Sequence, residues 1–289
     1  MKNKIPKHLL AQFFFFLFQN PLLKNFYEGK IYQGNLKQIC TPSLNCYSCP
    51  AAITSCPIGA MQLFLAGAKH SLSLFVTGFL LCTGVIFGRF ICGYVCPMGL
   101  LQDLLYKIKT PKLILKLRFL RYIKYIILIT FVLIVPLIVI NEWSGLGSPW
   151  FCKYICPSGT IFGAVPLLTV NDFLRGLVGL QFFLKVAVAA GIVFMSVILK
   201  RFFCRVLCPL GAIYSLFNPV TFIKMRCDKD RCIACGRCSK ACLLCIDPTK
   251  QPNAPECVRC GGCINACDAR ALGYTIAKPH QPIQADQSE

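Results

Sequence analysis

Long apolar runs separated by basic loops fill the first three quarters of this 289-residue chain. Residues 71–88, 125–141 and 176–199 are uncharged apart from Lys185, and each approaches the roughly 20 apolar residues that span a bilayer. A shorter run at 9–23 predicts a tilted span or an interfacial helix. We therefore predict an α-helical membrane bundle of three to four spans.

Basic residues ahead of the 9–23 run are also compatible with a signal peptide. No small-residue cleavage site follows the run, however, and a signal peptide needs such a site. We therefore expect this segment to stay in the mature protein.

Composition agrees with a membrane protein, since 56% of the residues are hydrophobic, 15% are charged and the mean hydropathy is +0.61. The net charge of +20, from 31 basic and 11 acidic residues, could indicate a nucleic-acid partner. Much of the excess, however, lies in loops that flank the apolar runs. Anionic lipid head groups are therefore the expected counter-charge, and we expect no nucleic-acid partner.

The distribution of basic residues predicts the orientation in the cytoplasmic membrane, because cytoplasmic loops are enriched in lysine and arginine. Loop 89–124 has eight basic residues against the single acid Asp103, whereas loop 141–175 has only two. Loop 89–124 is therefore expected in the cytoplasm and loop 141–175 outside. The same parity places the chain after residue 199 in the cytoplasm and the cysteine-rich segment 20–70 outside.

The last quarter of the chain has a different pattern, with eight cysteines in two C-x2-C-x2-C-x3-C runs. In proteins with two [4Fe–4S] clusters, three cysteines of each run bind one cluster and the fourth binds the other. Structural zinc sites, the alternative, use pairs of C-x2-C knuckles instead. We therefore predict two clusters, the first bound by Cys232, Cys235, Cys238 and Cys267 and the second by Cys257, Cys260, Cys263 and Cys242.

A second cysteine motif, C-P-x-G, occurs four times in the part of the chain that holds the apolar runs. At 92–99, 152–159 and 204–211 it ends a longer element, C-x3-C-P-x-G, and a shorter copy occupies 56–59. Cysteines four apart share one side of a helical turn, and proline suits the first turn of the next helix. Each element is therefore expected to present its thiols where two helices meet.

The predicted orientation groups these cysteines on the two faces of the membrane. The candidate four-thiolate site on the cytoplasmic face comprises Cys92, Cys96, Cys204 and Cys208. The candidate outer site comprises Cys40, Cys46, Cys49 and Cys56, with Cys152 and Cys156 as further ligands. Spacing leaves iron–sulfur clusters, copper(I), zinc and disulfides open at both sites. Lone Cys82 is expected to be a packing residue, and Cys227 and Cys245 fit neither ferredoxin ligand set.

These motifs resemble the NapH/NosR-type membrane-bound polyferredoxins, in which C-x3-C-P elements beside transmembrane helices precede a cytoplasmic tandem ferredoxin segment. The resemblance is carried by residues 45–62 (NCYSCPAAITSCPIGAMQ), 149–159 (PWFCKYICPSG) and 203–218 (FCRVLCPLGAIYSLFN). It implies electron transfer between the membrane quinone pool, or a membrane partner, and a redox protein.

We therefore expect an N-terminal hydrophobic segment with a cysteine-rich loop (1–70), a membrane bundle with three C-x3-C-P motifs (71–223), an α+β bacterial-type 2[4Fe–4S] ferredoxin domain (224–276) and a polar tail (277–289). The predicted function is that of a membrane-anchored electron-transfer subunit rather than a stand-alone enzyme. The main alternative is a metal-trafficking or metalloenzyme-assembly factor whose membrane thiols handle copper. A redox sensor that acts through a partner is a further alternative.

Overall fold

The computed structural model describes residues 6–67, 73–113, 119–139, 147–176, 178–242 and 244–276. The predicted polar tail, 277–289, lies outside the described residues. In chain order the elements are α1 (Lys7–Gln19), α2 (Asn25–Glu28), η1 (Asn35–Gln38), α3 (Pro57–Ala66), α4 (Leu74–Phe87), α5 (Phe90–Tyr94), α6 (Pro97–Leu105), η2 (Leu120–Tyr122), α7 (Ile123–Ile127), η3 (Leu128–Ile134), α8 (Val135–Ile138), η4 (Phe151–Ile155), η5 (Gly159–Ala164), α9 (Val165–Val170), α10 (Asp172–Gly176), α11 (Leu180–Ile198), α12 (Phe202–Val206), α13 (Pro209–Phe217), β1 (Ile223–Cys227), α14 (Arg237–Ala241), α15 (Gly262–Asn265) and β2 (Leu272–Ile276).

Two helices among the described residues are long and apolar enough to cross a membrane. They are the continuous helix Leu120–Ile138, composed of η2, α7, η3 and α8, and helix α11. Only 22% and 17% of their apolar stretches are buried inside the protein, whereas the core helix of a soluble protein is mostly buried. Their exposed apolar surface therefore favours contact with lipid.

The other two predicted apolar runs form shorter helices, α4 with 14 residues and α1 with 13. Both fall below the roughly 20 residues of a full span. Helix α4 ends at Gly88, whose positive φ of 52° is a conformation that residues with a side chain rarely adopt. The backbone therefore stops this helix at the end of its apolar run.

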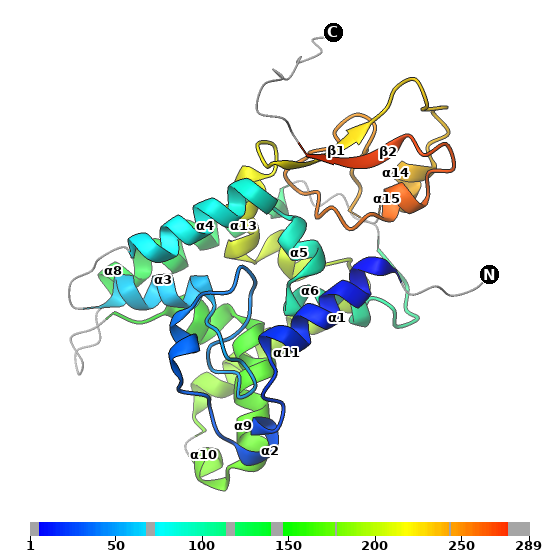
Figure 1. The fold of residues 1–289 in the computed structure, drawn as a ribbon. Helices are drawn as coiled ribbons and strands as arrows, with labels where there is room; N and C mark the ends of the chain where they lie inside the picture. The colour runs from blue at the N-terminus through cyan, green and yellow to red at the C-terminus, as the bar shows by residue number, and fades with distance from the viewer. Residues whose placement is uncertain are drawn as a thin grey trace.

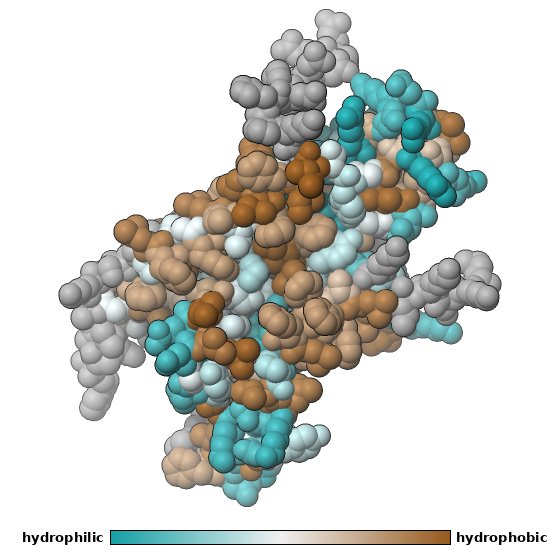
Figure 2. Space-filling model, in the orientation of Figure 1, coloured by the Kyte–Doolittle hydropathy of each residue, from teal (hydrophilic) through white to brown (hydrophobic). Residues whose placement is uncertain are grey.

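The apolar surface lies over the helical part of the molecule. Figure 2 shows hydrophobic residues across the middle of the view, with hydrophilic residues gathered at the β1–β2 end and at the opposite end near α2 and α10. Helix α1 exposes 54% of Phe13, 65% of Phe14 and 69% of Phe18. Large exposed apolar patches are typical of faces that contact a membrane or a partner.

The last part of the chain forms a small α+β unit at one end of the helices (Figure 1). β1 pairs antiparallel with β2 in a register that runs from Ile223 opposite Ile276 to Cys227 opposite Leu272. Helices α14 and α15 follow β1 and precede β2 in the chain, and the two helices pack against each other. The strand pairing therefore closes the loop that contains both ferredoxin-type cysteine runs.

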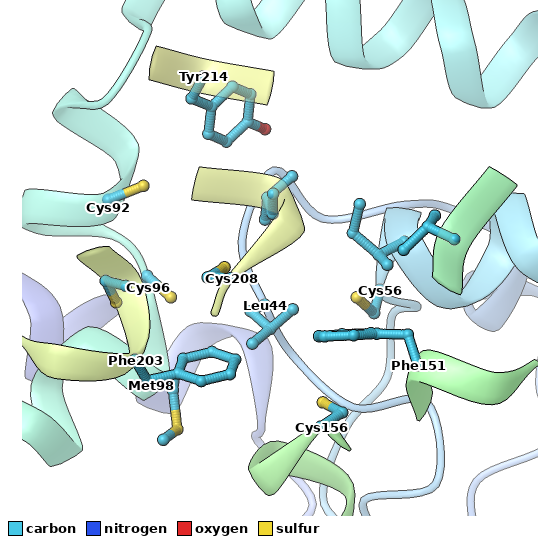
Figure 3. Packing of buried hydrophobic residues seen from close by; sticks show 14 of the residues in the cluster. Leu44, Cys56, Cys92, Cys96, Met98, Phe151, Cys156, Phe203, Cys208 and Tyr214 are labelled. Atoms are coloured by element: carbon cyan, nitrogen blue, oxygen red, sulfur yellow. The ribbon is translucent and has the colours of Figure 1, made fainter. Parts of the chain in front are cut away.

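The core of the helical part is built around thiols. Large side chains such as Phe151, Phe203 and Tyr214 are fully buried among these thiols. Figure 3 shows Leu44 between two groups of these cysteines. The cysteines in the main cluster of buried apolar residues are Cys40, Cys56, Cys92, Cys96, Cys156, Cys204 and Cys208.

Candidate metal centres

Two cavities, one in the C-terminal unit and one between this unit and the helical part, sort the eight ferredoxin-type cysteines into two sets. Cavity I, of about 450 Å³, is lined by Cys232, Cys235, Cys238 and Cys267. Cavity II, of about 140 Å³, is lined by Cys242, Cys257, Cys260 and Cys263. These are the sets expected when each run contributes its fourth cysteine to the other site.

The two runs share a local backbone conformation. The residue before the second cysteine, Ala234 in one run and Arg259 in the other, has a φ of 51°. The residue after the second cysteine, Gly236 or Gly261, also has a positive φ and precedes helix α14 or α15. Left-handed turns of this kind are uncommon outside glycine. Each run therefore turns tightly around its cavity before it enters a short helix.

Two further cysteines of this unit occupy different positions. Cys227, the last residue of β1, also lines cavity I. Cys245 lines neither cavity I nor cavity II. Cavity I thus has a fifth thiol beside its four predicted ligands.

A third cavity, here named the inner cavity, lies within the helical part. Its free volume is about 10 Å³, so a multi-iron cluster fits there only if the cysteine side chains turn outward. One pair of its cysteines lies in α5 and just before α6, and the other lies in α12 and just before α13. The cysteines that line it are Cys92, Cys96, Cys204 and Cys208, the set predicted for the cytoplasmic face.

A fourth cavity, the outer cavity, has a volume of about 270 Å³ and is lined by Cys46, Cys56, Cys152 and Cys156. The structure therefore brings together only part of the predicted outer set. Cys40 forms an isolated bridge with Ser55, and the Cys49 thiol donates to Asn20 Oδ1 at 3.7 Å. Neither of these two cysteines lines the outer cavity. Cys82 is exposed on α4 rather than packed in the core.

Each position of the C-P-x-G motif has a structural reason. The cysteine immediately precedes a helix, and the proline is the first helical residue, where no backbone N–H is needed. The glycine N–H can then donate to the sulfur, as Gly211 N does to Cys208 Sγ at 3.3 Å. A Cβ atom on Gly99 or Gly211 would lie 2.9 or 3.0 Å from the carbonyl oxygen of Cys92 or Cys204. The motif therefore places a sulfur at a helix N-terminus, where the helix dipole favours negative charge.

Two arginines tie the cysteine pairs of the inner cavity together. Arg89 Nη2 donates to the carbonyl oxygen of Cys204, and Arg201 Nη1 donates to that of Cys92, each at 2.8 Å. Each arginine precedes the first cysteine of its own motif by three residues and contacts the first cysteine of the other. The two motifs are therefore joined reciprocally, with two buried guanidinium groups beside the four thiols.

Asp103 neutralises one of these arginines. Its carboxylate pairs with Arg201 and lies 2.5 Å from Lys200 Nζ. Burial alone would raise the pKa of Asp103, but the two cations outweigh burial and hold the pKa well below its usual range. The carboxylate is therefore charged at neutral pH.

Glu256 neutralises the other arginine and joins the C-terminal unit to the helices. Its carboxylate lies 2.7 Å from Arg89 Nη1 and 2.6 Å from Lys124 Nζ. Burial opposes ionisation, but these cations hold the pKa of Glu256 below its usual value. Asn218 of the helical part also donates to the carbonyl oxygen of Cys257 at 3.0 Å. The segment that begins the second cysteine run is therefore fixed directly to the helical part.

Two glutamine side chains, each just after one C-P-x-G element, donate to a thiol of a different element. Gln102 Nε2 donates to Cys204 Sγ at 2.9 Å in the inner cavity. Gln62 Nε2 donates to Cys152 Sγ at 3.6 Å at the outer cavity. Hydrogen bonds to sulfur tune the reduction potential of an iron–sulfur centre.

The buried thiols are poor nucleophiles and suitable metal ligands. Burial raises the pKa of Cys156 to about 11 and the pKa values of Cys204 and Cys263 to about 12. A reactive cysteine has a lowered pKa instead. A metal centre can displace the protons of such thiols when it binds.

The donor sets fit iron–sulfur clusters. Four thiolates are the ligand set of a [4Fe–4S] cluster. No group of three or more His, Cys, Asp or Glu side chains in the described parts of the chain is arranged to hold one metal ion. Cavity I, cavity II and the outer cavity, of about 450, 140 and 270 Å³, each present at least four thiols around a free space.

Sequence reasoning missed the residues that join the cavities. Arg89 and Arg201 carry a readable signal, because both begin an R-F-x-C element. Gln62 and Gln102 occupy the same place in two C-P-x-G-x2-Q elements. Leu44, which lines both the inner and the outer cavity, carries no such signal.

A family model described as "4Fe-4S binding domain" matches the chain three times, at residues 70–119, 125–180 and 182–226. The matches cover just over half of the chain. Each contains one C-x3-C-P-x-G element. Both ferredoxin-type runs lie outside the matched segments.

Two proteins of Methanocaldococcus jannaschii are similar to this chain. "Uncharacterized protein MJ0750" is 28% identical over 206 residues, which are 67% of this chain and 74% of that protein. "Uncharacterized protein MJ0749" is 24% identical over 218 residues, 75% and 77% of the two chains. "Putative electron transport protein YccM" of Escherichia coli is 25% identical over 223 residues, 73% of this chain and 57% of that protein. No solved structure matches.

Proposed function

The chain belongs to the 4Fe-4S binding domain family, and we propose that it is a membrane-anchored iron–sulfur protein that carries electrons between a membrane partner or quinone and a redox protein. Similarity to a protein named as an electron transport protein supports this role. In this proposal the thiols of cavity I and cavity II bind one [4Fe–4S] cluster each, and the inner cavity provides a further centre.

One observation carries the proposal, namely that the four cysteine cavities form an unbroken series. Helix α14 supplies Cys238 to cavity I and is followed directly by Cys242 of cavity II. Arg201 lines cavity II and donates to the Cys92 carbonyl of the inner cavity. Leu44 lines both the inner and the outer cavity. Each cavity therefore adjoins the next, as an electron path requires.

The chain's own residues prepare these cavities for anionic clusters. A [4Fe–4S] cluster, when bound, takes up or releases an electron at a potential that depends on net charge and on hydrogen bonds to sulfur. Arg89 and Arg201 each share one carboxylate with a lysine, so each group keeps a net positive charge beside the inner cavity. Gln102 also donates to one sulfur of this cavity. Positive charge and N–H donors favour the reduced, more negative state of a cluster.

The helices Leu120–Ile138 and α11 support the membrane anchor. We propose that α4 and α1, although shorter than a full span, complete a bundle of three to four spans where the bilayer thins around them. Both expose large apolar side chains, such as Phe75 on α4 and Phe18 on α1. The distribution of basic residues favours an orientation in which the C-terminal unit faces the cytoplasm. A soluble redox partner would then meet cavity I, while membrane lipid surrounds the helices.

Electron transfer across vesicles tests the proposal. The full chain is loaded with iron and sulfide without oxygen and inserted into vesicles that contain trapped ferricyanide. Dithionite outside is the electron donor, and each electron that crosses converts one ferricyanide to ferrocyanide. We expect the ferricyanide absorbance to fall at least tenfold faster than in protein-free vesicles.

Two cysteine variants provide the comparison. Cys204→Ser removes a sulfur of the inner cavity and should slow the transfer at least tenfold, while cavities I and II keep about eight iron atoms. Cys82→Ser is the matched control, because Cys82 lies in the helical part but lines none of the four cavities. Equal rates in Cys204→Ser and wild type would contradict the path. Copper in place of iron in the anaerobically purified chain would favour the assembly-factor alternative.

A further inference from the structure

The outer cavity combines cysteines that the family match does not group. Cys152 and Cys156 lie in the second matched segment, whereas Cys46 and Cys56 precede the first. All four nevertheless line one cavity of about 270 Å³. The inner cavity has about 10 Å³, so the four outer thiols already surround far more space.

The outer cavity repeats the construction of the inner cavity. Gln102 donates to Cys204 at the inner cavity, and Gln62 donates to Cys152 at the outer cavity. Each glutamine stands six residues after the cysteine of its own C-P-x-G element. Each reaches the first cysteine of a C-x3-C-P-x-G element elsewhere in the chain. The same pairing of elements therefore occurs twice in the helical part.

Cys46 takes the place of the missing first cysteine in the 56–59 element. Nine residues separate it from Cys56, where the complete elements have three. A Cβ atom on Gly159, the glycine of the paired element, would lie 3.5 Å from Cys46 Sγ. The loop that carries Cys46 therefore packs against the same helix start that Cys156 precedes.

A basic residue also lies at the outer cavity. Lys185 of α11 lines the cavity, and a Cβ atom on Gly159 would lie 3.4 Å from Lys185 Nζ and 3.5 Å from Cys46 Sγ. A lysine ammonium at the wall can offset the negative charge of a thiolate-bound cluster.

We infer that the outer cavity is a fourth iron–sulfur site, a [4Fe–4S] centre bound by Cys46, Cys56, Cys152 and Cys156. The inference rests on the proposed function, because it adds one centre to the same series. Leu44 lies between this centre and the inner cavity and lines both. Figure 3 shows Leu44 with Cys56 and Cys156 of the outer cavity on one side and Cys96 and Cys208 of the inner cavity on the other. The outer site is thus the end of the series remote from cavity I.

Iron counting in single-cysteine variants of the full chain tests this site. We expect the anaerobically produced wild type to hold about 16 iron atoms, four for each cavity. Cys46→Ser and Cys152→Ser should each hold about four fewer and lose one cluster signal in low-temperature EPR of the reduced protein. The signals of cavities I and II should persist and show that the variants have folded.

Cys40→Ser and Cys49→Ser are the matched controls, because both cysteines are buried in the same loop region as Cys46 but line none of the four cavities. Both should keep the wild-type iron content. Wild-type iron in Cys46→Ser, or an equal loss in Cys49→Ser, would overturn the ligand assignment while leaving the proposed function intact. Absence of iron–sulfur signals from the wild type would instead refute the proposed function.

Discussion

Replacement of Glu256 by glutamine tests how the C-terminal unit is held on the helices. The carboxylate lies 2.7 Å from Arg89 and 2.6 Å from Lys124, and the side chains of both cations are fully buried. Glutamine is similar in size but carries no charge, so two buried cations would lose their counter-ion. Removing one partner of a buried ion pair costs about 3–5 kcal/mol. We expect Glu256→Gln to destabilise the attachment of the C-terminal unit by about 3 kcal/mol, at the lower end of that range, because the glutamine oxygen can still accept a hydrogen bond.

Asp268→Asn is the matched control. Asp268 also adjoins a predicted ligand, Cys267, and also pairs with an arginine, Arg237. The two side chains of this pair are 74% and 64% exposed. Exposed pairs contribute only about 0–1 kcal/mol, so this variant should remain close to wild type. The comparison separates loss of a buried counter-charge from loss of any acid beside a ligand cysteine.

Hydrogen–deuterium exchange of the iron-loaded full chain measures the difference. The Cys257 amide donates to the carbonyl of Ala254 at 2.9 Å within the attached segment, so its exchange reports opening there. A loss of about 3 kcal/mol raises the opening constant by roughly 100-fold, and the amide should exchange faster by that factor in Glu256→Gln. Equal exchange in Glu256→Gln and Asp268→Asn would refute the argument that burial sets the strength of this attachment.

Gly211→Ala places a Cβ atom 3.0 Å from a backbone oxygen, and chemical unfolding should show a loss of stability of about 1–3 kcal/mol. The control is Gly191→Ala, because no atom lies within 4 Å of the added Cβ there. This control should be neutral or stabilising by up to about 1 kcal/mol. Cys227→Ser should keep the iron of cavity I and Cys267→Ser should lose about four iron atoms, as iron analysis would show; the reverse result would make Cys227 the ligand. Anaerobic removal of iron by a chelator should lower the midpoint of thermal unfolding of the helical part, because the freed buried thiols no longer link separate segments. An unchanged midpoint would mean that the thiols of the inner and outer cavities bind no metal.

Local spacing groups three cysteines of each predicted ferredoxin-type set, and the fourth follows from the exchange that is typical of two-cluster proteins. The predicted sets line cavities I and II, and their binding of clusters stays a prediction. Within each run the sulfurs are brought together by a few residues of backbone, as the repeated left-handed turns at Ala234 and Arg259 illustrate. The family match supports 4Fe–4S chemistry for the chain independently, since it rests on the other cysteine motif.

Apolar patterning located the apolar helices but not their lengths. Runs 125–141 and 176–199 correspond to helices long enough to span a membrane. The 71–88 run has the same character, yet α4 begins only at Leu74, after the N-cap Ser73, and has 14 residues. Hydrophobicity reports the environment that a segment prefers, whereas the two ends of a helix depend on local capping and backbone conformation, here at Ser73 and Gly88.

The sequence by itself determined the kind of chemistry, because ligand type and close spacing within a run depend only on covalent connection. The tertiary structure alone decided which cysteines share the outer cavity. It selected Cys46 rather than Cys40 or Cys49 for the outer cavity, and it placed Leu44 between the inner and outer sites. Segments a hundred residues apart meet through the sum of many small packing contacts. The spacing of the cysteines between residues 40 and 56 therefore does not show which of them that packing will bring to the element at 152–159.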